Sequence, residues 1–173
     1  MLFTHYGVSG PLVLSASRHV GELPGSLLVI DLKPGLDDET LDTRIQRDFT
    51  AKARKQFGNA LDDLLPKTLI PVITHLSGIP AEVPVHQITR GQRHALSHLL
   101  KHLTMTVKRA RSFAEAITTT GGVSIRELES RTMQSKLIHG LYFTGEVIDV
   151  DGYTGGFNLQ IAWSTGHLAG ESV

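Results

Sequence analysis

Apolar residues recur at every fourth position through the middle of the chain, with charged residues of both signs between them. The recurring positions are Leu41, Ile45, Phe49, Ala53 and Phe57. This spacing places the apolar side chains on one face of a helix of about five turns. We therefore expect a single amphipathic helix over residues 37–57, ended by the Gly58-Asn59 pair.

Shorter apolar clusters predict further helices. Leucines at residues 61–65 indicate a short second helix, and the apolar segment at residues 69–76 indicates a third. Gly78 follows the third, as glycine often does just beyond the end of a helix. Residues 36–102 are therefore predicted to form a helical insert subdomain.

A capping box at Thr89 and Gln92 opens the last helix of this region. Three histidines then recur every four residues along it, at positions 94, 98 and 102. His94 and His102 would lie about 12 Å apart along the axis, so the three cannot bind one metal ion together. The favoured interpretation is that the histidines lie on a solvated helix face; metal binding by a neighbouring pair of them remains as an alternative. We predict no metal site.

Short strands are predicted on both sides of the helical region. Residues 1–35 contain two β-type runs, at residues 1–4 and 26–32, around a helix that starts at Pro11 after the capping residue Gly10. His5 follows the first run.

After residue 103 the period changes to two, which predicts a strand over residues 103–107 and a partner strand over residues 113–119. Residues 103–129 would return to the β-rich part. A turn at Gly121-Gly122 follows, and residues 141–143 are predicted to be a short buried strand.

The end of the chain carries the most specific pattern. The predicted strand runs into Gly145-Glu146, a loop rich in Gly and Asp follows, and a helix opens near Phe157. Such a unit presents backbone N–H groups and the positive end of a helix to a negatively polarised ligand. It predicts the C-terminal half of a nucleotide-cofactor site. A dinucleotide fold begins with a G-x-G-x-x-G turn, and the most similar segment near the N-terminus, residues 7–11, has the wrong spacing. The chain is therefore interpreted as part of a larger protein.

Composition narrows the classes of function. Lys plus Arg and Asp plus Glu both number 17 among the 173 residues, so overall charge predicts no attraction to nucleic acid or acidic membranes. The absence of cysteine excludes disulfides, thiolate zinc sites and dithiol relays from this segment. No apolar run is long enough to span a bilayer and no signal peptide is evident, so a cytoplasmic protein is expected. The start at Met1, without a polar lead-in, suits a cut inside a longer protein.

Several motifs resemble the BaiN/YhiN-type FAD-dependent NAD(P)/FAD oxidoreductases. They span nearly the whole chain in the family's order. The blocks cover residues 3–11 (FTHYGVSGP), 119–124 (TTGGVS), 132–136 (TMQSK), 140–146 (GLYFTGE) and 151–158 (DGYTGGFN).

The resemblance implies an α+β fold. A small β-barrel-like subdomain would hold the helical insert, and residues 130–173 would be a strand-loop-helix piece of an incomplete α/β FAD-binding domain. It implies a FAD cofactor, with NAD(P)H as a possible electron donor, and a small-molecule substrate for the intact enzyme. The implied flavin contacts are Gly145, Glu146, Gly155, Gly156, Phe157 and Asn158. This chain alone would be inactive.

Alternatives remain beside this interpretation. Residues 84–114 carry six cations and no acid, which would suit a non-catalytic binding module with a basic face for phosphate or nucleic acid; a solvated basic face is favoured. His5 is a candidate proton donor, against a structural role in its loop. The Asp149-x-Asp151-Gly152 run lacks the further ligands of a calcium loop. Residues 141–170 are expected to self-associate if their partner sheet is missing.

Overall fold

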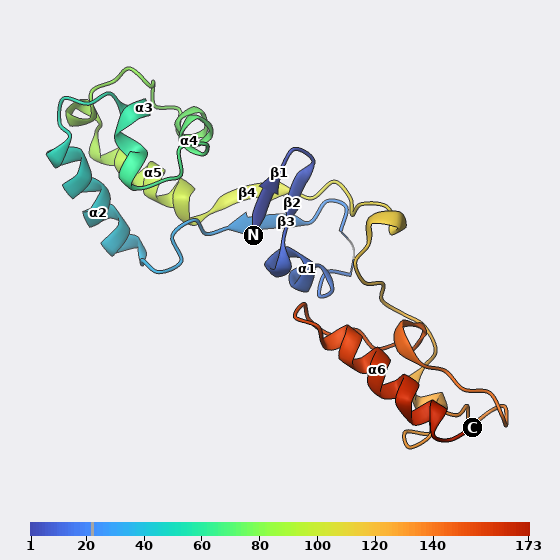
Figure 1. Cartoon of the computed structure of the whole chain (residues 1–173). Coiled ribbons are helices and arrows are strands. Elements are labelled where there is room, and N and C mark those ends of the chain that lie inside the picture. Colours follow the sequence, from blue (N-terminus) through green and yellow to red (C-terminus); the bar gives the residue numbers. More distant parts are fainter. Residues whose placement is uncertain (22) are drawn as a thin grey trace. The chain divides into compact units, whose positions relative to one another are not determined.

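The computed structural model describes residues 1–21 and 23–173, which form two units (Figure 1). The helical unit comprises Ser26–Val107, and the terminal unit combines Met1–Gly25 with Lys108–Val173. Each unit has a buried core of its own. The α+β fold class is confirmed, since the described residues combine helices with small antiparallel sheets.

The helical unit packs its helices beside one antiparallel strand pair (Figure 1). Strands β3 (Leu27–Ile30) and β4 (Leu103–Thr106) pair with Leu28 opposite Met105. The helices are α2 (Asp38–Ala51), α3 (Phe57–Ala60), α4 (Ile70–Ser77) and α5 (Arg90–Lys101), with single 3-10 turns at Leu61–Asp63 and Val85–Gln87. Their apolar faces meet in one core, in which Phe57, Leu41, Ile45, Ile73, Leu96 and Leu100 are fully buried.

Local capping follows the sequence prediction in this unit. Thr89 accepts from the backbone N–H of Gln92 while the Gln92 side chain accepts from that of Thr89, so both halves of the capping box are present. Gly78 ends α4 in the left-handed conformation at φ 67°. Both predictions are confirmed because they depend on hydrogen bonds between near neighbours.

The prediction of one helix over residues 37–57 is wrong. Helix α2 ends at Ala51, and the following segment forms backbone hydrogen bonds with residues 81–85 instead of continuing the helix. Phe57 N–H donates to Val83 O at 2.8 Å, and Gly58, expected to stop the helix, lies inside α3. The second helix expected at residues 61–65 is shorter, a 3-10 turn over Leu61–Asp63.

Charged side chains of the helical unit pair largely among themselves. Arg93 donates to both carboxylate oxygens of Asp42, at 2.7 and 3.0 Å, and this contact holds the pKa of Asp42 below its ordinary value. Lys101 contacts Asp31 at 2.6 Å and donates to the Leu36 carbonyl. The side chains of Arg93 and Lys101 therefore connect α5 to α2 and to the segment after β3.

The terminal unit begins with a β-hairpin. Strands β1 (Leu2–Thr4) and β2 (Gly7–Ser9) pair antiparallel, and α1 (Pro11–Ser17) follows with Gly10 as its capping residue. The rest of the unit is mostly irregular, with 3-10 turns at Phe113–Glu115, Ile125–Glu127 and Gly145–Val147, and it ends in α6 (Phe157–Gly170).

Two predicted strands of the terminal unit are wrong. Residues 113–119 contain a 3-10 turn with Phe113 exposed, because the strand that pairs with β4 is β3, far upstream. Residues 141–143 form only an isolated bridge, between Tyr142 and Gln134, and Leu141 is exposed. These segments satisfy their backbone groups locally and do not extend a sheet.

Candidate flavin-contacting loop and helix

The N-terminal end of α6 is open. Gly155 and Gly156 have φ values of 126° and 90°, which favour glycine, and a Cβ at Gly156 would meet nothing within 4 Å. No side chain caps the helix, and its first turn holds no acidic residue. The first backbone N–H groups of α6 are therefore left for an external acceptor, and the helix dipole favours a negatively charged one.

Asn158 fixes the loop before this helix. Its amide oxygen accepts from Gly152 N–H at 2.6 Å, and its amide nitrogen donates to Gly152 O at 3.2 Å. A Cβ at Gly152 would lie 2.9 Å from Phe157 Cβ, so the loop passes too close for any larger residue. The side chain of Asn158 is thus occupied within the chain, whereas Phe157 is exposed.

Gly145 and Glu146, in the 3-10 turn Gly145–Val147, lie beside a later turn of α6. Gly145 has a φ of 70°, and its N–H donates to Thr165 Oγ1 at 3.0 Å, while Glu146 is exposed. Thr165 follows Phe157 by eight residues, about 12 Å of helix axis. The six predicted residues therefore form two groups along α6, which only an extended ligand would contact together.

His5 occupies the turn between β1 and β2. Its ring lies edge-on against Tyr6, with the centroids 4.9 Å apart, and it is exposed. A catalytic role for His5 stays a prediction.

Four of the six cations of residues 84–114 have partners within their own unit. Besides the pairs of Arg93 and Lys101, Arg111 pairs with Glu115 and lies over the Tyr6 ring at 3.8 Å from its centroid. Arg90 donates to His94, and the exposed rings of His98 and His102 stack at 4.5 Å. Among the residues that the structure describes, no three His, Cys, Asp or Glu side chains are placed to hold a metal ion.

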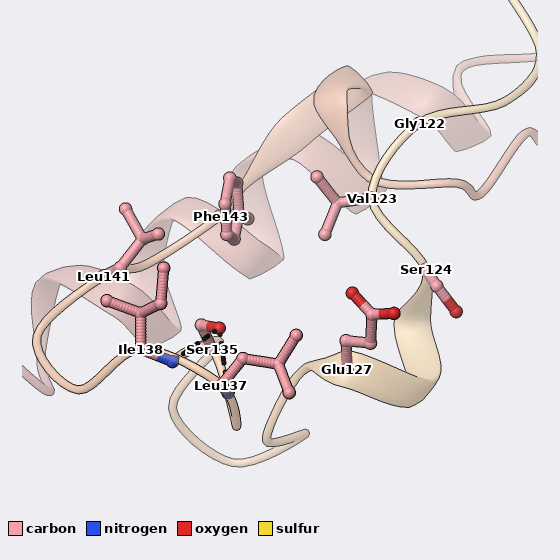
Figure 2. Close-up of a pocket in the computed structure, with 9 residues that line it drawn as sticks. All are labelled: Gly122, Val123, Ser124, Glu127, Ser135, Leu137, Ile138, Leu141 and Phe143. Atoms are coloured by element: carbon pink, nitrogen blue, oxygen red, sulfur yellow. Dashed lines mark hydrogen bonds between the residues drawn. The ribbon is translucent and has the colours of Figure 1, made fainter.

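The terminal unit contains a pocket of about 340 Å³ that was not predicted from the sequence. Figure 2 shows the residues that line it. Apolar side chains dominate its lining, with Glu127 as its charged group and Ser124 and Ser135 as its hydroxyls. The Ser135 hydroxyl accepts from the backbone N–H groups of Leu137 and Ile138. The remaining lining residues are Gly122, Val123, Leu137, Ile138, Leu141 and Phe143. The signal in the sequence was the apolar Leu137-Ile138 pair directly after a polar stretch.

A second missed feature is a cluster around Tyr153, in the loop before α6. His19 Nε2 lies 2.9 Å from Tyr153 Oη, and the Arg18 guanidinium carbon lies 4.8 Å from the centroid of the Tyr153 ring. Arg18 also donates to Asp151 at 3.2 Å. These residues are more than 130 positions apart in the chain, and no local pattern could have joined them.

Comparison with protein families identifies the chain. The profile of the "HI0933-like protein barrel and H2TH domain" family matches residues 1–118. The chain belongs to the HI0933-like family. Its predicted membership of the BaiN/YhiN-type flavoproteins is thereby confirmed.

Several HI0933-like relatives have names that state an activity. The chain is 38% identical over 165 residues to a ribosomal RNA dihydrouridine synthase of Escherichia coli, a match that covers 95% of the chain. It is 33% identical over 190 residues to a 3-dehydro-bile acid delta(4,6)-reductase of Clostridium scindens, and 32% identical over 173 residues to a ribosomal RNA dihydrouridine synthase of Haemophilus influenzae; both matches cover the whole chain.

The chain spans 40%, 43% and 42% of the lengths of these three relatives, in the same order. No helix among residues 1–21 and 23–173 is both long and apolar enough to cross a membrane.

Proposed function

We propose that this chain is the insert and C-terminal part of a FAD-dependent oxidoreductase and supplies part of the flavin site. The observation that carries the proposal is the uncapped, glycine-flanked start of α6, found in a member of a flavoprotein family. In this proposal the helical unit belongs to the substrate-side insert, and residues 130–173 return to the FAD-binding domain.

The residues present fit such a cofactor. The start of α6 would stabilise negative charge at the pyrimidine edge of the flavin by about 0.3–2 kcal/mol. The exposed carboxylate of Glu146 would accept hydrogen bonds from ribityl hydroxyls, which are neutral donors. Asn158 would act by holding the Gly152 loop in place. When bound and reduced, FAD supplies a hydride from its N5 atom.

The names of the relatives suggest the class of reaction. Making dihydrouridine and reducing a 3-oxo bile acid at positions 4 and 6 both saturate a carbon–carbon double bond conjugated to a carbonyl group. We propose the same reaction class here, with NAD(P)H as the source of electrons. Uridine in ribosomal RNA is the first substrate to test, because the E. coli relative has the higher identity of the two. This choice departs from our sequence expectation of no nucleic-acid partner.

The first test is flavin binding. We expect the full-length protein that contains this chain to retain FAD through purification, which is detected as a flavin absorption band at about 450 nm. Glu146→Ala should weaken FAD binding about tenfold to a hundredfold, the effect of losing one or two hydrogen bonds to a charged group. Titration of the apoprotein with FAD measures this change.

Glu129→Ala is the matched control, since Glu129 is an exposed carboxylate of the same unit outside the proposed site. Equal affinities of the Glu146→Ala and Glu129→Ala proteins would remove Glu146 from the site. A full-length protein that binds no FAD would contradict the proposed function as a whole.

We also propose that this chain alone self-associates through residues 141–170. One face of α6 presents Leu159 and Trp163, 58% and 67% exposed, while the opposite face packs Leu168 against the small core. Trp163→Glu should abolish the association, because a charge would enter the apolar contact. Sedimentation velocity at several concentrations measures the change, and a wild-type monomer throughout the series would refute the proposal.

A further inference from the structure

We propose that Tyr153 is the proton donor of the reduction, and that His19 and Arg18 are positioning residues acting through it. The inference rests on the proposed function. It names a residue that neither the sequence motifs nor the comparisons assign.

The reaction class requires an acid. When hydride adds to one carbon of a conjugated double bond, the electron pair of that bond moves to the neighbouring carbon and the carbonyl, which then needs a proton. The 173 residues contain no cysteine, so a thiol of this chain cannot supply that proton. Tyr153 carries an O–H group two residues before Gly155, on the loop that leads into the proposed flavin contacts.

The surroundings of Tyr153 suit proton transfer. His19 Nε2 lies within hydrogen-bond distance of the phenol oxygen, so the N–H of an imidazolium at His19 can replace the proton that the phenol gives away. The guanidinium of Arg18 lies over the ring and stabilises the phenolate that forms when the proton leaves. It does so through cation–π attraction to the ring and through the attraction of its positive charge for the negative phenolate.

The loop around Tyr153 is held from both sides. Asp151 contacts Arg18, Gly152 is bonded to Asn158, and the Thr154 hydroxyl lies 3.5 Å from that of Ser15. Tyr153 itself stays half exposed, so its hydroxyl remains open to a substrate. A donor fixed by neighbours but open on one side is what a preorganised acid requires.

The proton balance closes within these groups. The substrate takes a hydride at one alkene carbon and a proton from the Tyr153 O–H bond at the other. His19, as imidazolium, then returns a proton to the phenolate oxygen and becomes neutral imidazole, which takes up one proton from solvent. Bound reduced FAD would supply the two electrons, and NAD(P)H would be their source.

The test compares Tyr153→Phe with wild-type full-length, FAD-loaded protein. The flavin is reduced anaerobically and mixed with a uridine-containing ribosomal RNA fragment or a 3-oxo steroid with a conjugated double bond. Flavin reoxidation is followed in a single turnover. Tyr153→Phe should slow reoxidation about 10²–10⁴-fold. Reoxidation by ferricyanide, which forms no C–H bond, should not change.

Tyr6→Phe is the matched control. Tyr6 is also half exposed, with a histidine beside its ring and an arginine over it, and it should react at the wild-type rate. In this chain, the ¹⁵N resonance of His19 Nε2 should shift in Tyr153→Phe and stay in place in Tyr6→Phe. This second measurement does not depend on bound flavin.

The outcomes separate the two proposals. Wild-type rates in Tyr153→Phe with either substrate would overturn the proton donor and leave the proposed function standing. If Tyr153→Phe slows reoxidation equally with substrate and with ferricyanide, Tyr153 has a structural role, and the proton-donor proposal is overturned as well. If the wild-type flavin reacts with ferricyanide but with neither substrate, the proposed reaction class is wrong and the proton donor falls with it.

Discussion

Replacing Gly122 with alanine is expected to destabilise the terminal unit by about 2–5 kcal/mol, the combined cost of backbone strain and a forced contact. Gly122 has a φ of 137°, and a Cβ there would lie 2.3 Å from the carbonyl oxygen of Val147. That oxygen accepts the N–H of Val123 at 2.9 Å, next to the bridge between Val123 and Ile148. The added methyl group would separate the two segments that carry the small core.

Gly121→Ala is the control for this prediction. Gly121 also has a positive φ, 91°, but a Cβ there would meet nothing within 4 Å. It should therefore show only the backbone cost, about 1–2 kcal/mol. Urea unfolding followed by the fluorescence of Trp163 in α6 compares the two. Equal losses in both variants would mean that the Val147 carbonyl gives way.

Phe57→Ala should destabilise the helical unit by about 3–5 kcal/mol, the usual loss for removing a buried aromatic ring. Phe57 is fully buried, and its ring meets that of Phe49 edge to face with the centroids 6.3 Å apart. Because domains of this size are stable by only about 5–15 kcal/mol, much of the unit's stability would be lost.

Phe113→Ala removes the same ring from an 88% exposed position in the terminal unit and should change stability by less than about 0.5 kcal/mol. Thermal unfolding measures the stability of both variants, and amide resonances show which unit opens. Phe57→Ala should open the helical unit and leave the terminal unit intact. A loss below about 1 kcal/mol would show that the core closes over the vacated space.

The sequence predicted local features and failed where distant segments pair. The capping box at Thr89 and the left-handed Gly78 involve neighbours within a few residues, so the residue types suffice. The four-residue period ran through Ala53 to Phe57, yet α2 ends at Ala51. Periodicity reports which side chains are apolar, and both a longer helix and two packed segments can bury them.

The strands show the same limit. A period of two identified residues 103–107, but the partner strand came from residues 27–30, because local alternation carries no information about which strand lies alongside. Residues 113–119 also looked like a strand, and without a neighbour they formed a 3-10 turn at Phe113–Glu115.

For the candidate site, the sequence by itself determined the family, the start of α6 and the glycines before it, since these lie within one short continuous segment. The tertiary structure alone decided three further points. Asn158 is used to hold Gly152, Gly145 lies about 12 Å along α6 from the helix start, and Tyr153 contacts His19. The first two contacts join residues 6 and 20 positions apart across an irregular loop, for which no periodic or capping pattern gives the pairing. The third joins residues 134 positions apart, so it depends on how distant segments pack.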